Sequence, residues 1–291
     1  MDQQYNKLLE KVLKEGIVSE DRTGVGTISS FGEVISYDLS EGFPAVTTKK
    51  LAWKSVVAEV LWMLEGSSDE RRLAEFVHGK AREEIVEKTT VWTANANAQG
   101  VALSYQNDDL VKELGPVYGV QMRKWDGDYD QFSDLLKGIK ENPNSRRHIL
   151  SLWNANVIDQ MALPPCSFLS TYYVRNGKIS CMLVIRSNDL FLGHPFNVAQ
   201  YALITHMIAK ECGLDVGELK ICISDAHIYT NHVEQVIEQI SRVPYKLPTL
   251  AISDDFDLTD RLQNGFRMED VNMFSLENYQ YHPTIKASMA V

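Results

Sequence analysis

Cys166 is the residue of this sequence best suited to nucleophilic chemistry. It directly follows Leu163-Pro164-Pro165, and two prolines restrict the backbone and remove two amide donors, so the thiol sits on a rigid approach to the next element. A free cysteine is more often a small buried apolar residue than a nucleophile. The residues that follow Cys166 in the chain shift the balance toward the nucleophile.

A polar set, Arg186-Ser187-Asn188-Asp189, ends a stretch that is otherwise apolar. Arginine binds anions through a planar fork of N–H donors, and the neighbouring hydroxyl suits the same task. This set therefore predicts a site for an anion or a polar ligand. The alternative is a structural ion pair between Arg186 and Asp189, which is a common and weak surface feature.

Two predicted strands position these groups. Residues 168–174 and 178–186 are rich in aromatic and β-branched side chains, and Arg175-Asn176-Gly177-Lys178 joins them. Asn-Gly between two such runs is the strongest short signal for a β-hairpin. The second strand is therefore expected to return alongside the first.

A carboxylate and an indole are two further candidates. Glu59 lies beside the broad apolar face of a helix predicted over residues 53–64, where a carboxylate is usually solvated unless a ligand or water faces it. Trp92 stands in a polar segment, 91–97. Its ring either anchors that segment to the core or faces a planar ligand, and the sequence favours neither.

A strand predicted over residues 221–229 places Asp225, His227 and Tyr229 on one face, because side chains alternate along a strand. A surface strand would rarely combine a carboxylate, an imidazole and a phenol. Arg146 and Arg147 follow a turn, 142–145. Adjacent side chains of an extended chain point to opposite sides, so this pair is better placed at a subunit edge that reaches a partner than within one subunit's site.

The remaining pattern predicts a mixed α/β chain. A helix is expected at the N-terminus, a strand over 28–37, a helix over 129–141, and a buried helix over 197–212 that ends at Gly213. No linker or repeat divides the 291 residues, so we expect one domain over 1–291, with a variable polar insertion around 67–109.

Composition excludes several classes of protein. The net charge is −10, which argues against a general nucleic-acid surface because duplex binding depends on lysine and arginine. No apolar run reaches the roughly 18 residues of a membrane span, and the N-terminus has no targeting pattern. The four cysteines show no CxxC spacing, so we expect free thiols, no metal site and a cytoplasmic location.

Assembled, these residues resemble the thymidylate synthase family over nearly the whole chain. The resemblance depends on long motifs: DRTGVGT, FPAVTTKK, LGPVYG, NPNSRRHI, ALPPC, RSNDLFLGHPFN, DAHIY and the terminal HPTIK. The segment TTKKLAWK and the insertion before Trp92 most resemble those of bacteriophage members. A phage origin would place the protein in the cytoplasm of the host. The resemblance implies an α/β (α+β) fold with a large, mostly antiparallel sheet that forms the face of an obligate homodimer.

The resemblance also implies a reaction. Cys166 would attack C6 of dUMP, and 5,10-methylenetetrahydrofolate would deliver a one-carbon unit to C5. Nearby Arg186 would help to ionise the thiol. Four arginines would bind the phosphate: Arg22 and Arg186, with Ser187, from one subunit, and Arg146 and Arg147 from its partner. No metal takes part.

Other residues match family positions with assigned roles. Asn197 would pair with the uracil edge, which an amide can satisfy because it both donates and accepts. His227 and Tyr229 would hold the ribose 3′-hydroxyl, Glu59 would organise water for proton transfers, and Tyr118 would support removal of the C5 proton. The positions expected to contact the folate are Lys49 near its glutamate tail, Trp92, Asn95, Asp189 and Val291.

The sequence departs from the usual family pattern at five positions: Ser167 stands for histidine, Met122 for tryptophan, Thr93 for aspartate, Ile185 for glutamine and Ser224 for glycine. Together these changes suggest a looser and wetter site, which bears on the last chemical step. Hydride transfer from the folate gives dTMP, whereas attack by water gives 5-hydroxymethyl-dUMP. We therefore expect a folate-dependent methyltransferase, with a dUMP hydroxymethyltransferase as the alternative. A non-catalytic nucleotide- or RNA-binding protein is a further alternative, which the retained thiol and arginines oppose.

Overall fold

The computed structural model describes residues 1–20 and 24–289. Its central element is a six-stranded sheet with the order β1-β2-β6-β5-β4-β3. Every neighbouring pair is antiparallel except β5 and β6, so the prediction of a mostly antiparallel sheet is confirmed. The strands are β1 (Ile17–Ser19), β2 (Thr27–Asp38), β3 (Ile149–Ser151), β4 (Ser167–Arg175), β5 (Lys178–Asp189) and β6 (Asp215–Tyr229).

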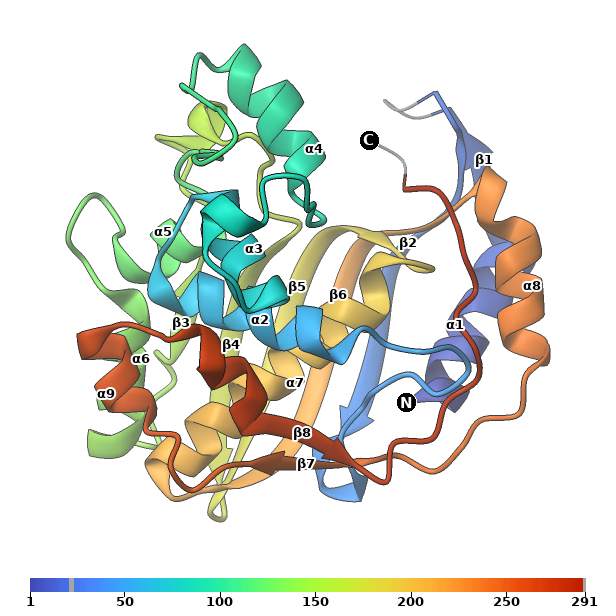
Figure 1. Cartoon of the computed structure of the whole chain (residues 1–291). Helices are drawn as coiled ribbons and strands as arrows, with labels where there is room; N and C mark the ends of the chain where they lie inside the picture. Colours follow the sequence, from blue (N-terminus) through green and yellow to red (C-terminus); the bar gives the residue numbers. More distant parts are fainter. Residues whose placement is uncertain (21–23, 290–291) are drawn as a thin grey trace.

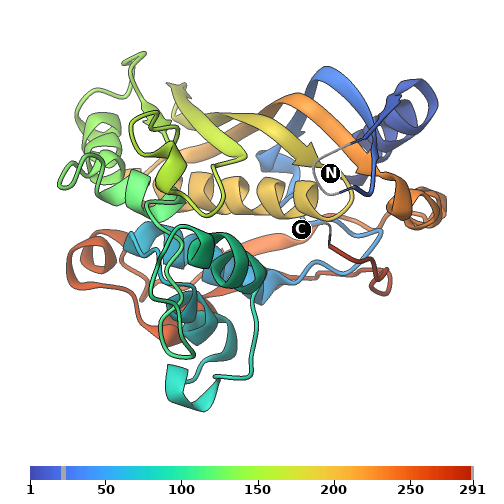
Figure 2. The same cartoon turned by 90° about the horizontal axis from the view of Figure 1, so that it is seen from above.

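Helices cover one face of this sheet. The long helix α7 (Gly193–Cys212) lies directly against β5 and β6, and α2 (Trp53–Glu65) packs on its other side (Figure 2). A small second sheet, β7 (Thr249–Ile252) with β8 (Phe274–Glu277), runs across the front of the view in Figure 1. The other helices are α1 (Asp2–Glu15), α3 (Glu70–His78), α4 (Thr93–Asn95), α5 (Tyr118–Arg123), α6 (Gln131–Glu141), α8 (Val233–Ser241) and α9 (Leu258–Asn264).

The predicted hairpin is confirmed. Arg175 pairs with Lys178, and Asn176 and Gly177 between them have φ of 51° and 74°. A tight two-residue turn of the hairpin type requires positive φ at both central positions, which asparagine and glycine tolerate. This turn sets the register that brings the end of β5 back to the start of β4, where Ser167 faces Ile185.

Helix α7 is the crossover that makes β5 and β6 parallel. It begins at Gly193, four residues before the predicted start at 197, because Pro195 is tolerated in a first helical turn. It ends as predicted at Cys212, with Gly213 at φ 64°. Its side chains are buried on nearly every side, since the sheet and α2 enclose it.

The parallel pairing of β5 and β6 has a consequence for function. It aligns Ser187 with Asp225 and Asp189 with His227. Polar side chains predicted from separate motifs therefore meet at the carboxyl ends of two neighbouring strands. Strand β6 starts at Asp215, six residues earlier than predicted from 221–229, and α6 begins at Gln131 rather than 129.

Candidate active site

Cys166 directly precedes β4, and hydrogen bonds hold its backbone and that of the two prolines before it. Its backbone N–H donates to the hydroxyl of Tyr118 at 2.8 Å, and its carbonyl accepts from the N–H of Arg186 at 2.9 Å. The guanidinium of Arg186 donates to the carbonyls of Pro164 and Pro165, both at 2.9 Å. The rigid approach expected from the two prolines is thus fixed by the arginine of the next strand.

The same arginine faces the thiol. Nη2 of Arg186 lies 3.8 Å from Sγ of Cys166. Burial raises the pKa of Cys166, while the Arg186 guanidinium and the Tyr118 hydroxyl lower it in part. The cation therefore acts in the expected direction, and burial outweighs it, so the thiol at rest is mainly protonated.

Asp189 has a different partner from the one considered above. Its Oδ1 accepts from the backbone N–H groups of Phe191 at 2.9 Å and Leu192 at 3.1 Å. The structure shows no ion pair between Arg186 and Asp189, both of which it describes, so the structural ion-pair interpretation is wrong. Arg186 has no carboxylate partner among the described residues, and its guanidinium faces the thiol.

Glu59 is hydrogen-bonded on both oxygens. The indole Nε1 of Trp92 donates to Oε1, and the amide Nε2 of Gln200 donates to Oε2, each at 2.7 Å. Burial raises the pKa of Glu59, and the two hydrogen bonds oppose that rise. The alternative that the Glu59 carboxylate is simply solvated beside the apolar face of the helix is therefore wrong. A carboxylate with a raised pKa beside a cleft is suited to moving protons.

Trp92 anchors its own segment. Its ring packs between Trp62 and Tyr118, with centroids 6.0 Å and 5.7 Å away, and only 6% of it is exposed. Below it, the hydroxyls of Thr93 and Thr90 donate to Oε1 of the buried Glu70, at 2.6 Å and 2.7 Å.

The departure at Thr93 thus has a physical reason. A hydroxyl can donate to the carboxylate of Glu70, whereas the aspartate usual at this position would place two carboxylates side by side. The other departures are also packed: Met122 and Ile185 are fully buried, Ser167 is 2% exposed and Thr93 is 8% exposed. Ser224 is half-buried.

The predicted face of β6 is confirmed. Nδ1 of His227 lies 2.9 Å from Oδ1 of Asp225, and its ring meets that of Tyr229 edge-on at 5.1 Å. The carbonyl of His227 accepts from the N–H of Leu190 at 2.8 Å, which joins this face to the end of β5. Ser187 is half-buried beside it.

An apolar pocket of about 350 Å³ opens next to Glu59. It suits a flat aromatic ligand because apolar surface dominates and one carboxylate stands at its wall. Its lining residues are Ser55, Glu59, Leu73, Val77, Thr89, Thr90, Val91, Phe196 and Met289.

Some predicted residues are not brought to this site within one chain. Arg146 and Arg147 are exposed and form no ion pair with any described residue. The β3–β4 register places Arg147 near Tyr173, seven residues along β4 from Cys166. That corresponds to about 23 Å of strand.

Lys49 and Asn95 lie apart from the pocket lining. Lys49 is buried, with its ammonium hydrogen-bonded to the carbonyl of Phe191 and placed 3.6 Å from that ring's centroid. Asn95 donates to Gln99 at 3.3 Å. Their contacts with a folate stay predictions, and Arg22 and Val291 lie outside the described residues.

Two residues next to the site were missed by sequence reasoning, Gln200 and His194, while Asn188 belongs to the polar set predicted over residues 186–189. Gln200 binds Glu59, and Asn188 donates to Oδ1 of Asn197 at 3.0 Å. His194 and Gln200 stand three positions before and after Asn197 on α7. The i, i+3 spacing of a helix was the available signal.

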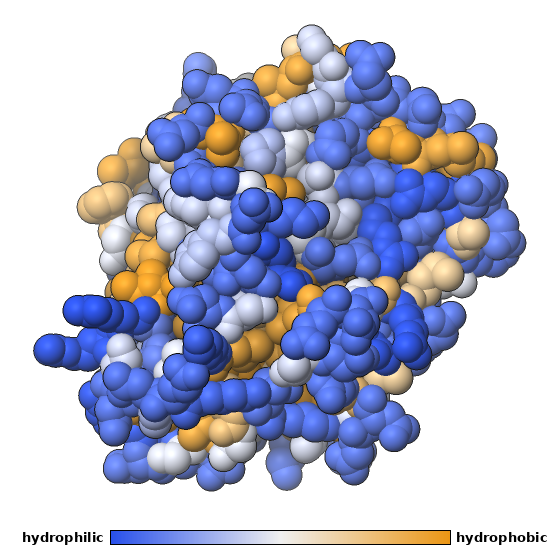
Figure 3. Space-filling model, turned by 90° about the vertical axis from the view of Figure 1, so that its left-hand side faces the viewer, coloured by the Kyte–Doolittle hydropathy of each residue, from blue (hydrophilic) through white to orange (hydrophobic). Residues whose placement is uncertain are grey.

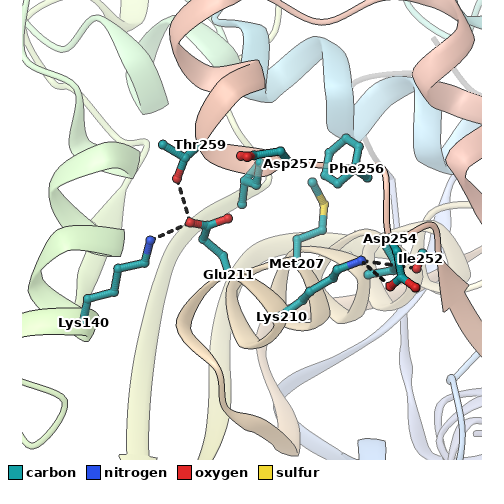
Figure 4. Close-up of a pocket in the computed structure, with 10 residues that line it drawn as sticks. Lys140, Met207, Lys210, Glu211, Ile252, Asp254, Phe256, Asp257 and Thr259 are labelled. Atoms are coloured by element: carbon teal, nitrogen blue, oxygen red, sulfur yellow. Dashed lines mark hydrogen bonds and ion pairs between the residues drawn. The ribbon is translucent and has the colours of Figure 1, made fainter.

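A larger pocket, of about 470 Å³, lies at the far end of α7 (Figure 4). Four of its five charged side chains form two ion pairs: Glu211 accepts from Lys140 at 2.5 Å and also from Thr259 at 2.7 Å, and Lys210 lies 3.6 Å from Asp254. No nucleophile faces it. The side of the molecule that carries α6 and α9 is mostly hydrophilic, with smaller hydrophobic areas (Figure 3).

Two general features complete the description. All four cysteines are free thiols. Among residues 1–20 and 24–289, no helix has the length and apolar character of a membrane span, and no group of three or more His, Cys, Asp or Glu side chains is arranged to hold a metal.

Comparison with known proteins agrees with this geometry. The family model described as thymidylate synthase matches residues 3–291. A protein of Escherichia phage T5, named "Probable thymidylate synthase", is 45% identical over 289 residues, which cover 99% of each chain. A match of this extent across the hairpin, α7 and β6 shows that the chain belongs to the thymidylate synthase family.

Proposed function

We propose that this protein is a thymidylate synthase, which converts dUMP to dTMP with 5,10-methylenetetrahydrofolate as co-substrate. The observation that carries the choice of product is the burial around Trp92. The departures expected to loosen the site are packed in the core, with Met122 and Ile185 fully buried and Thr93 8% exposed. Tight packing around Trp92 keeps water out of the site, which favours hydride transfer over attack by water.

Cys166 is the proposed nucleophile. Its thiolate attacks C6 of dUMP, which makes C5 an enolate-like carbon able to accept a one-carbon unit. Arg186 binds the nucleotide phosphate together with Ser187 and favours the thiolate through its charge 3.8 Å away. Asn197 pairs with the uracil edge, and His227 with Tyr229 binds the ribose hydroxyl.

Glu59 and Tyr118 handle protons. Burial raises the pKa of Glu59, which favours its holding a proton, and its hydrogen bonds to Trp92 and Gln200 fix the orientation of the carboxylate. Burial holds the pKa of Tyr118 well above its usual range, so its hydroxyl stays protonated and acts as a donor.

The pocket beside Glu59 is the proposed folate site. Beyond its lining, the residues expected to contact the folate are Asp189, Trp92, Asn95 and Val291, with Lys49 near the glutamate tail. When bound, the folate supplies the one-carbon unit and the hydride. The protein's own part is to orient the two ligands and to exclude water.

We also propose that the active unit is a homodimer. Helices cover one face of the sheet, and the other face exposes large apolar side chains: Val34 (66%), Tyr173 (55%), Ile149 (48%) and Met182 (41%). A sheet face of this kind is typical of an interface. A partner's Arg146 and Arg147 would then complete the phosphate site, which explains their distance from Cys166 in one chain.

One reaction tests the product. Purified protein is incubated with dUMP and methylenetetrahydrofolate. Formation of dihydrofolate is followed by absorbance, and the mass of the nucleotide product is measured by mass spectrometry. Gain of a methylene group with dihydrofolate supports the proposal. Gain of formaldehyde's mass without dihydrofolate would instead identify a hydroxymethylase. Binding of dUMP without tritium release from 5-tritiated dUMP would identify a non-catalytic binding protein.

Two variants test the nucleophile and the shared site. Cys166→Ala should abolish turnover while dUMP still binds, and Cys212→Ala, at the far end of α7, should leave turnover unchanged. Mixing Cys166→Ala subunits with Arg147→Ala subunits should restore activity in some heterodimers. If exchange is confirmed and no activity returns, the sites are not shared.

A further inference from the structure

A chain of hydrogen bonds runs from Asn197 into the core, away from Cys166. Nδ2 of Asn188 donates to Oδ1 of Asn197 at 3.0 Å, and Oδ1 of Asn188 lies 2.7 Å from Nδ1 of His194. Nε2 of His194 lies 2.8 Å from the hydroxyl of Tyr37. Asn188 and Tyr37 are each 2% exposed, and His194 is fully buried.

Three separate elements build this chain. Tyr37 comes from β2, Asn188 from β5, and His194 with Asn197 from one face of α7. The ring of Tyr5 stacks on His194, with centroids 5.1 Å apart and planes at 28°. Stacking and burial leave the imidazole no second position, so its two nitrogens stay directed at Asn188 and Tyr37.

The hydrogen bonds share one direction. Burial lowers the pKa of His194 to about 3, so its ring is neutral and carries a single N–H. Asn188 points its amide N–H₂ at Asn197 and its carbonyl at His194, which places the N–H on Nδ1. Nε2 then accepts from the hydroxyl of Tyr37. Every donor points toward Asn197.

This direction decides what Asn197 can offer a base. With Oδ1 bound to a donor from Asn188, its second lone pair and its N–H₂ group remain for a ligand. Uracil presents an N3–H donor beside an O4 acceptor, which this orientation matches. Cytosine presents the reverse pattern, and a flipped Asn197 that matched cytosine would turn its N–H₂ against the N–H₂ of Asn188.

We propose that Asn188, His194 and Tyr37 form a positioning relay that holds the Asn197 amide in the orientation that accepts uracil and rejects cytosine. The inference deepens the proposed function and depends on it, because it requires that Asn197 meets the base. None of the three relay residues touches the nucleotide. They act through Asn197 alone.

Binding measurements on the full protein test the relay without requiring turnover. The ligands are dUMP, dCMP and 2-deoxyribose 5-phosphate, which has the sugar and phosphate but no base. Asn188→Ala should lower the affinity for dUMP by about 5- to 10-fold, which corresponds to the loss of one hydrogen bond. It should also reduce the ratio of the affinity for dUMP to the affinity for dCMP. Affinity for deoxyribose phosphate should not change.

Tyr37→Phe removes one oxygen at the far end of the relay and serves where Asn188→Ala folds poorly. It should reduce the preference for dUMP over dCMP by a smaller factor, because the imidazole of His194 can then adopt the other tautomer. Tyr172→Phe is the matched control: another buried tyrosine of the sheet, outside the relay, whose loss should leave the preference unchanged.

The outcomes separate the two proposals. If the unmodified protein fails to bind dUMP, the proposed function fails. If it binds dUMP but both relay variants keep its preference, or weaken all three ligands equally, the relay fails. A nitrogen-15 spectrum that shows the proton of His194 on Nε2 would also overturn the relay.

Discussion

The hydroxyl of Tyr118 accepts the backbone N–H of Cys166 at 2.8 Å. This bond ties α5 to the first residue before β4, so the backbone of the proposed nucleophile is positioned by a residue 48 places earlier in the chain. Tyr118 also packs edge-on against Trp92. One phenol thus connects Cys166 to Trp92, whose indole donates to Glu59 at the wall of the proposed folate pocket.

Tyr118→Phe should lower turnover by roughly 10- to 100-fold, because a partly buried N–H loses its acceptor and unmade bonds of this kind cost about 1–3 kcal/mol. Affinity for dUMP should change little, since Tyr118 bonds the backbone of Cys166. Steady-state kinetics with a separate binding assay distinguish the two. Tyr105→Phe, at the carbonyl of Gln160, is a control remote from the thiol. Loss of dUMP affinity equal to the loss of turnover would contradict this role.

Removing the cation beside the thiol should make the thiol harder to ionise. Arg186→Met leaves burial, which raises the pKa of Cys166, without its main opposing charge. The midpoint of Cys166 alkylation by iodoacetamide should therefore move to higher pH. Arg175→Met, at the other end of β4, should leave the midpoint in place. An unchanged profile in Arg186→Met would mean that this guanidinium does not act on the thiol.

Restoring the residue usual in the family at position 93 should destabilise this protein. Thr93→Asp sets a carboxylate against the buried Glu70, in place of a 2.6 Å hydrogen bond, at a cost of about 1–3 kcal/mol. Thr93→Val removes the donor to Glu70 and the acceptor for the Thr90 backbone N–H, but it adds no charge and should cost less. Urea unfolding at fixed protein concentration measures both. If the Thr93→Asp variant is as stable as the original protein, Arg71 or water compensates the added negative charge.

Lys49 should make stability depend on pH. Desolvation lowers its pKa from 10.5 to about 7, so between these values the unfolded chain binds a proton that the folded chain does not. Stability from this group is full above pH 10.5, declines by up to about 1.4 kcal/mol per pH unit below it, and is lost as pH falls through about 7.

Lys49→Met should remove that slope. The unfolding free energy of the original protein, measured relative to that of Lys49→Met, should therefore rise from pH 7 to pH 9. Lys50→Met, at the exposed neighbouring lysine, should keep the slope of the original protein. Parallel curves for the original protein and Lys49→Met would mean that Lys49 is charged in the fold.

The sequence by itself determined the local elements and predicted Cys166 as the nucleophile. Asn176-Gly177 dictated the hairpin because few other residues accept two positive φ values in succession. The alternation of Asp225, His227 and Tyr229 placed them on one face, and the apolar residues of α2 and α7 marked the core. Long motifs indicated the family, which the whole-chain match confirmed.

Only the tertiary structure decided which side chains are partners. The bonds of Glu59 to Trp92 and Gln200 span 33 and 141 positions, and the relay from Tyr37 to Asn197 crosses β2, β5 and α7. No local pattern encodes such pairs, because they depend on how a parallel crossover packs helix on sheet. The same packing buried the unusual residues Met122, Thr93 and Ile185, which the sequence alone suggested would open the site to water.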